Sequence, residues 1–239
     1  MENAEFDHAL IDAAFALAAE KGWAAVSIAE AARRKELSLA QARVRFPNRA
    51  SLLLKFGRMA DQAALADPPK EGTVRDRLFY LIMQRIDFLQ AHRSGVLALM
   101  RALPGEPDVG LLLACATKRS MRWLLEAAGV SSRGLRGELR TKGLMGVWFW
   151  AMRTWQSDET ADMSQTMSAV DNALRQAERF AGWLGRTQPS TDATAEAVLG
   201  DEIPQGEPPE PESPPPPETP PSPPIPPMPP TSLPPEPLA

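Results

Sequence analysis

The sequence predicts an all-α protein that ends in a proline-rich tail. Residues 1–186 contain only five of the 25 prolines, and apolar residues recur there at helical spacing. No stretch of this part alternates apolar and polar residues over the length of a strand. Residues 187–239 hold the other twenty prolines, and such a composition lacks backbone donors and buries too little apolar surface to fold. We therefore predict helices up to residue 186 and a disordered tail of polyproline II character after it.

The first predicted helix spans residues 5–21. An apolar stripe with i, i+4 spacing runs along it, and Gly22 provides a stop signal. The stripe consists of Phe6, Leu10, Ala14, Leu17 and Ala18.

Two short helices follow, separated by a tight turn. Ser27 with Glu30, and Ser38 with Gln41, each match the capping box, in which two side chains satisfy the first backbone amides of a helix. The two helix starts lie eleven residues apart with no proline between them. Pro47 closes the unit, because proline disfavours helix at the residue before it. This spacing predicts a helix-turn-helix.

Six more helices are predicted from apolar periodicity and from the positions of proline. Their expected ranges are 49–66, 73–91, 93–102, 108–128, 132–156 and 162–185.

Charge is distributed unevenly along the chain. All 26 lysines and arginines lie in residues 1–186, against 21 acidic residues, whereas the tail has nine acidic residues and no basic one. The acidic isoelectric point of about 5.4 therefore reflects the tail, while the helical part is basic. Between residues 27 and 58, eight basic residues stand against two acidic ones.

The composition disfavours several classes of protein. The single cysteine, Cys115, excludes an internal disulfide framework, and because it follows the apolar run VGLLLACA we expect it to be buried. The N-terminus lacks a signal pattern and no stretch has the roughly 18 apolar residues of a membrane span, which predicts a cytoplasmic protein without stable membrane insertion. Two isolated histidines, and the absence of phosphate-loop or nucleophile motifs, predict no enzyme, no metal site and no cofactor.

Residues 9–56 resemble the N-terminal domain of the TetR family of bacterial transcriptional regulators. The positions in register with the family pattern are Gly22, Ser27, Ala32, Ser38, Phe46, Pro47, Asn48 and Leu52. The resemblance implies a helix-turn-helix DNA-binding domain at 1–66 and a helical ligand-binding and dimerisation bundle at 67–186, followed by the tail at 187–239. It further implies a homodimer that binds double-stranded DNA, acts as a repressor and responds to a small apolar effector.

Three positions depart from the family pattern. Glu36 stands where the family has its turn glycine, and a glutamate adopts a positive φ only at a cost. The turn must then use another backbone path or accept strain. Arg43 replaces the family's phosphate-binding tyrosine, and Arg49 replaces the lysine that opens the fourth helix. Both changes keep or add positive charge, which favours phosphate contact.

The basic residues of this domain are candidates for DNA contact. In a helix-turn-helix, the first residues of the second helix meet base edges and flanking cations contact phosphates. Glutamine can pair with adenine and arginine with guanine. The predicted DNA-binding residues are Ser27, Ser38, Leu39, Gln41, Arg43, Arg45 and Arg49. The alternative is a solvated basic face on a helical bundle.

The aromatic segment GLMGVWFWAMRTW, in the predicted helix 132–156, is the second candidate site. Helical spacing puts Trp148, Met152 and Trp155 on one face, and Met145 and Phe149 on an adjoining one. Two apolar faces are typical of a helix that packs on its own core and on a second subunit, and methionines with aromatics also line ligand cavities. We predict that these five residues form the dimer interface or line the ligand pocket.

Residues 143–174 also resemble the TetR-fold lipid-binding accessory protein of ubiquinone biosynthesis. The matching positions are Trp155, Asp158, Asp162, Thr166 and Asp171. This resemblance implies a second hypothesis, a lipid- or isoprenoid-binding accessory protein that no longer binds DNA. The last predicted helix is amphipathic with a tryptophan near its end, so it could form part of a dimer or rest on a membrane surface.

Overall fold

The computed structural model describes residues 3–186, with side chains for residues 3–179. Within this range there are nine α-helices and no strand, which confirms the all-α prediction. The helices are α1 (Asn3–Lys21), α2 (Ile28–Arg34), α3 (Leu39–Arg45), α4 (Arg49–Leu65), α5 (Val74–Gln90), α6 (Arg93–Ala102), α7 (Pro107–Ala127), α8 (Gly134–Ser157) and α9 (Ser164–Arg186). Two short 3₁₀ turns, Trp23–Ala25 and Leu103–Gly105, complete the order. The predicted tail at 187–239 lies outside the described residues.

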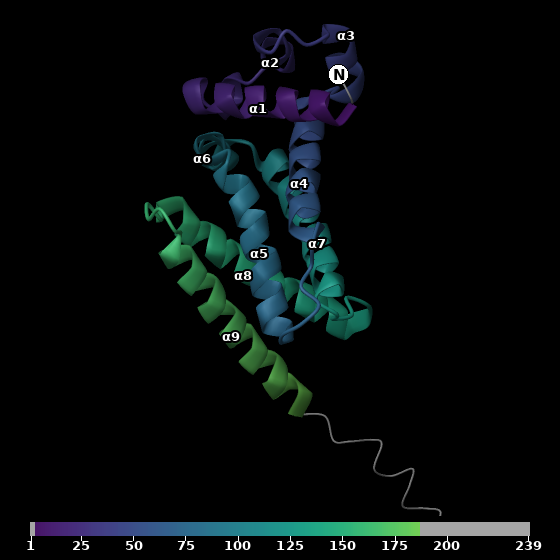
Figure 1. Ribbon diagram of the computed structural model, residues 1–239, viewed down its shortest axis with the longest axis vertical. Helices are drawn as coiled ribbons and strands as arrows, with labels where there is room; N and C mark the ends of the chain where they lie inside the picture. The colour runs from purple at the N-terminus through teal and green to yellow at the C-terminus, as the bar shows by residue number, and fades with distance from the viewer. Residues whose placement is uncertain (1–2, 187–239) are drawn as a thin grey trace, which may run out of the picture. The chain divides into compact units, whose positions relative to one another are not determined.

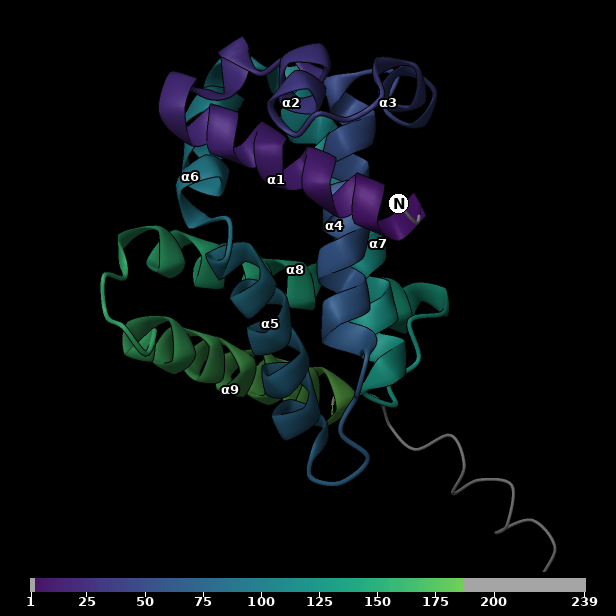
Figure 2. The same cartoon turned by 45° about the horizontal axis from the view of Figure 1, so that its top comes forward.

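The first three helices lie together at one end of the described region (Figure 1). α4 runs from the end of α3 toward α5 and packs against both α5 and α7, while α8 and α9 pack against each other along their lengths (Figure 2). α6 packs against α1 and so joins the first three helices to the rest. All nine helices belong to one compact unit, so the domain boundary at residue 66 stays a prediction.

The contact between α1 and α6 is close because α6 carries a glycine there. A Cβ atom at Gly95 would lie 2.3 Å from the backbone oxygen of Phe15. Beside it, His92 Nε2 and Asp12 Oδ1 are 2.8 Å apart, and the His92 ring packs edge-on against Phe15. This packing holds the helix-turn-helix unit against the larger group of helices.

The turn between α2 and α3 accepts backbone strain at Glu36. Its φ is +54°, which is the left-handed region where the TetR pattern has glycine. The turn is a Schellman motif: Leu37 N donates to Ala32 O at 2.8 Å and Glu36 N donates to Arg33 O at 3.1 Å. The glutamate therefore preserves the geometry of the turn instead of changing its path.

Relieving this strain should stabilise the protein. We expect Glu36→Gly to raise the free energy of unfolding by about 1 kcal/mol. Glycine adopts the left-handed conformation without the steric cost of a Cβ atom, and the greater conformational entropy of glycine in the unfolded chain offsets part of this gain. Urea unfolding of the two proteins measures the difference. Glu36→Ala is the matched control, since it removes the charge but keeps a Cβ atom. An equal gain in both variants would mean that the charge, and not the backbone, was the cause.

Only one of the two predicted capping boxes has its side-chain cap. Ser38 Oγ accepts a hydrogen bond from Gln41 N at 3.3 Å and so caps α3. Ser27 stands at the N-cap position of α2, but its side chain makes no capping bond there. The predicted partner Glu30 instead forms an ion pair with Lys21 of α1. The predicted capping box at Ser27 was therefore wrong: the Ser27 side chain makes no cap, and the Glu30 carboxylate binds a cation of another helix.

Cys115 is exposed, which corrects the prediction that it is buried. It lies in the first half of α7, where no residue before Ser120 is buried. Leu111, one turn earlier, is exposed as well. The run VGLLLACA is apolar on every side, so its sequence carries no signal for which side faces the core.

Candidate nucleic-acid interface and ligand domain

α3 is the most exposed helix of the N-terminal unit. Ala42 is its single buried residue, so the helix rests on a narrow contact. Leu39 and Gln41 near its start are exposed, as is Val44, whose exposed fraction is 82%. Sequence reasoning missed Val44, although its position three residues after Gln41 places it on the same side of the helix.

Arg43 is exposed and bonded only to its own loop. Its Nη1 donates to Pro47 O at 2.7 Å. This bond turns the side chain toward the connection between α3 and α4 and leaves it at the surface. The guanidinium is accessible to a partner.

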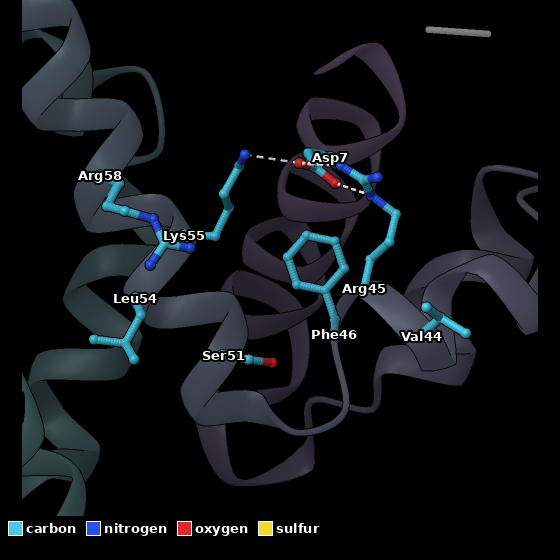
Figure 3. A pocket seen from close by; sticks show the side chains of 8 residues that line it. All are labelled: Asp7, Val44, Arg45, Phe46, Ser51, Leu54, Lys55 and Arg58. Carbon is cyan, nitrogen blue, oxygen red and sulfur yellow. Dashed lines mark hydrogen bonds and ion pairs between the residues drawn. The ribbon is translucent and has the colours of Figure 1, made fainter. Parts of the chain in front are cut away.

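Arg45 points away from the exposed side of α3 and toward α1. Its Nε donates to Asp7 Oδ1 at 2.6 Å and its Nη2 to Asp7 Oδ2 at 2.7 Å, while its Nη1 donates to Asn3 Oδ1 at 2.9 Å. Lys55 Nζ of α4 lies 2.8 Å from the same carboxylate (Figure 3). Burial by itself would raise the pKa of Asp7, but the hydrogen bonds from Arg45 and Lys55 outweigh it and hold that pKa below its ordinary value.

Arg49 lies where the helix-turn-helix meets the start of α7. Its Nη1 donates to Trp23 O at 3.1 Å and stands 3.6 Å from a carboxylate oxygen of Glu106, the residue before α7. The Arg49 side chain, which is predicted to contact a phosphate, therefore also makes contacts within the protein.

The remaining cations of the unit divide into paired and unpaired ones. Arg34 is bound to Glu20 by two hydrogen bonds of 2.7 and 2.5 Å. Arg33, Lys35 and Arg58 are exposed and have no ion-pair partner among the described residues. These three side chains add positive charge that no neighbouring carboxylate cancels.

The five aromatic and methionine residues of α8 separate into two groups. Trp148, Met152 and Trp155 are buried and Met145 is partly buried, whereas Phe149 is 53% exposed. Trp155 Nε1 donates to Gln90 Oε1 at 2.8 Å, which fixes the ring against α5. Two clefts in the described region, of about 390 and 350 Å³, are lined by other residues.

A buried ion pair lies beside Trp148 and was not predicted. Arg85 of α5 is 6% exposed; its Nη1 donates to Asp61 Oδ1 of α4 at 2.5 Å, and Ser120 Oγ donates to Asp61 Oδ2 at 2.6 Å. The guanidinium lies 4.7 Å from the centre of the Trp148 ring. Burial lowers the pKa of Arg85, and the Asp61 carboxylate opposes that shift.

The sequence carries a signal for this arginine. Arg85 occupies a position of the apolar stripe that contains Leu78, Leu81, Ile82, Ile86 and Leu89 of α5. A charged residue in a core stripe requires a buried partner.

Two of the residues that resemble the lipid-binding accessory protein, Asp158 and Thr166, form a helix cap. Asp158 is buried, and its carboxylate accepts from the backbone and hydroxyl of Thr160 (3.1 and 2.5 Å) and of Thr166 (2.8 and 2.7 Å). Burial alone would raise the pKa of Asp158, but these four bonds bring it to about 2. Asp158 and Thr166 thus have a structural role, because they hold the loop before α9.

These features define a class: an all-α protein with an exposed helix-turn-helix attached to a larger helical bundle. Two of the solved structures that are similar to it are TetR-type regulators. One is the TetR transcriptional regulator from Nitrosomonas europaea ATCC 19718, with a TM-score of 0.58 and 24% identity over 73% of this chain and 98% of that chain. The other is a TetR-family transcriptional regulator from Streptomyces coelicolor, with a TM-score of 0.53 and 18% identity over 83% of this chain and 98% of that chain. No family model and no curated protein matches the chain. The chain has the fold of the TetR-type transcriptional regulators, as its N-terminal motif predicted.

Proposed function

We propose that this chain is a homodimeric DNA-binding repressor of the TetR type that a small apolar ligand releases from DNA. The observation that carries the proposal is α3, a seven-residue helix with one buried residue at the surface of a helix-turn-helix. A recognition helix must leave its base-reading side chains free, and Leu39, Gln41 and Val44 are exposed. In this proposal the domain boundaries are those predicted, with DNA bound by 1–66.

The predicted DNA contacts take different roles in this proposal. Gln41 and Leu39 read bases, and Ser27, Ser38 and Arg43 contact phosphates at the edges of the groove. Arg49 contacts a phosphate from the start of α4. Arg45 acts from behind α3, because its guanidinium already binds Asp7.

The exposed face of α8 supports a homodimer. Leu135, Leu139, Phe149 and Trp150 are large apolar side chains on one helix, and all four are exposed. Large apolar side chains that are exposed together on one helix indicate an interaction site. A second copy of the chain would cover it through a two-fold interface, in which the same face is used by both partners.

The ligand is proposed to act through the bundle at 67–186. It releases DNA only if it binds the DNA-free state more tightly than the DNA-bound state. Met145, Trp148 and Met152 of α8 are the side chains proposed to contact it. For the rival hypothesis, a lipid-binding accessory protein, two of the five matching positions, Asp158 and Thr166, also have a structural role in the cap of α9. Within residues 3–186 no helix is long and apolar enough to cross a lipid bilayer.

The proposal is tested by DNA binding over a salt series. The purified protein is titrated with the duplex upstream of its own gene and with a shuffled duplex of equal length and composition. We expect a preference for the upstream duplex at every salt concentration. Equal affinity for both duplexes, together with lipid that co-purifies with the protein, would overturn the repressor and favour the accessory protein.

Substitutions in the same assay separate the two kinds of contact. Arg43→Ala should weaken binding to both duplexes by a similar factor and reduce the salt slope by about 1.8, because the homodimer loses one phosphate contact in each protomer. Gln41→Ala should reduce the preference and leave the slope unchanged. Lys70→Ala is the control, because it removes an exposed cation from the loop before α5. An effect of Lys70→Ala as large as that of Arg43→Ala would contradict the assignment of Arg43.

A further inference from the structure

We infer that Asp7 is a specificity-determining positioning residue: it fixes the recognition helix by holding Arg45 and Lys55, and thereby withholds both cations from DNA. The inference rests on the proposed DNA-binding function and adds a residue of α1 to it. Figure 3 shows the three side chains meeting between α1, α3 and α4. Asp7 is only 2% exposed, and its two oxygens together receive three contacts of 2.6 to 2.8 Å.

The contacts between Asp7 and Arg45 matter because few other side-chain contacts hold α3 in place. Ala42 is the one buried residue of the helix, and Phe46 directly after it is the neighbouring apolar anchor. Arg45 is the last residue of α3, so its paired bonds to Asp7 fix both the position and the rotation of that helix end. A planar guanidinium bound by two parallel hydrogen bonds has a defined orientation, which a single contact does not provide.

The contacts of Asp7 with Arg45 and Lys55 also determine how much positive charge faces DNA. An open cleft of about 390 Å³ lies beside α3, and Asp7, Arg45, Lys55 and Arg58 are among its lining residues. Arg58 has no ion-pair partner among the described residues, whereas Arg45 and Lys55 are bound to the one carboxylate. If that carboxylate were neutral, both cations could turn to phosphates, which carry no sequence information.

This role and a purely structural role predict opposite results. Loss of a structural contact disorders α3 and weakens binding to every sequence. Release of two cations instead strengthens binding to arbitrary DNA while the loosened α3 reads bases less well. The preference for the cognate duplex falls in the second case because the non-specific background rises.

The experiment compares Asp7→Asn with Asp12→Asn in the full chain. Both variants remove one negative charge from α1, but the carboxylate of Asp12 pairs with His92 and does not contact α3 or α4. The probes are the upstream duplex and the shuffled duplex, titrated between 50 and 200 mM salt.

For Asp7→Asn we expect tighter binding to the shuffled duplex and a salt slope steeper by about 1.8 to 3.6, the range for one or two new phosphate contacts in each protomer of the homodimer. The preference for the upstream duplex should fall about tenfold, the loss of one good base contact. Asp12→Asn should change the slope and the preference far less. Equal slopes in the two variants, or an unchanged preference in a folded Asp7→Asn protein, would overturn the inference.

Arg45→Lys decides the matter if Asp7→Asn does not fold. Lysine keeps the charge but not the two-pronged geometry, so the preference should fall without any steepening of the slope. Full preference in Arg45→Lys would mean that charge alone suffices, and the positioning role would be lost. If the wild-type protein shows no preference at all, the proposed function fails, and the difference in slope between Asp7→Asn and Asp12→Asn still decides whether Asp7 withholds cations.

Discussion

Replacing Asp61 with alanine is expected to lower the free energy of unfolding by about 3–5 kcal/mol, the largest effect of any single change considered for this chain. The substitution leaves the Arg85 guanidinium buried without its carboxylate, and Arg85 Nε already lacks a hydrogen-bond partner among the described residues. Ser120 Oγ also loses its 2.6 Å bond to Asp61 and is left with the longer bond, 3.2 Å, to Ala116 O. Urea unfolding followed by circular dichroism measures the loss.

The double variant Asp61→Ala/Arg85→Met tests the cause. Methionine fills a similar space without a charge, so the double variant should recover most of the lost stability. Glu178→Ala serves as the control, because it removes an exposed carboxylate that lies 4.0 Å from Arg75. If the double variant were as unstable as Asp61→Ala, lost packing around Asp61 would be the cause and the unpaired arginine would not.

Replacing Asp158 with asparagine is expected to cost about 2–3 kcal/mol at neutral pH, because charge-assisted hydrogen bonds from Thr160 and Thr166 are lost. The cost should depend on pH. The pKa of Asp158 is about 2 in the folded chain against an ordinary value of 3.8, so its stabilisation is fully present above about pH 4. It is lost as the pH falls through 2.

The measurement is the difference in unfolding free energy between wild type and Asp158→Asn from pH 7 down to pH 2. The difference should stay constant to about pH 4 and then shrink. Taking a difference removes the contribution of Glu138, whose pKa is also brought to about 2 by hydrogen bonds from Lys118 and Arg122. Asp162→Asn is the control in the same loop, since that exposed carboxylate accepts one bond, from Ser164 N. A difference independent of pH would contradict the role of the Asp158 charge.

Much of the candidate site could be predicted because its signals are local. The cap of α3 by Ser38 depends on residues three positions apart, and so does the exposed side of α3 that carries Gln41. The strain at Glu36 was also foreseeable, because the Schellman turn requires a left-handed residue at that position whatever the side chain. The two-sided apolar pattern of α8 is local as well, and in the structure Trp148 on one side is buried while Phe149 on the other is exposed.

The partners of the charged residues could not be predicted in this way. The sequence predicts that Arg45 contacts DNA, whereas in the structure it binds Asp7, 38 positions earlier in the chain. Glu30 was expected to cap α2 and instead binds Lys21. Cys115 was expected in the core and lies on the outer side of α7.

By itself, the sequence determined that this protein is helical and where its helices begin and end. It also determined that two short helices and the turn between them form a helix-turn-helix. These properties depend on hydrogen bonds and apolar spacing within a few residues. Only the tertiary structure decided that Arg45 faces α1 while Arg43 faces solvent, and that Arg85 is buried against Asp61. Arg43 and Arg45 carry the same charge on one short helix. Their roles diverge because distant carboxylates reach one of them and not the other.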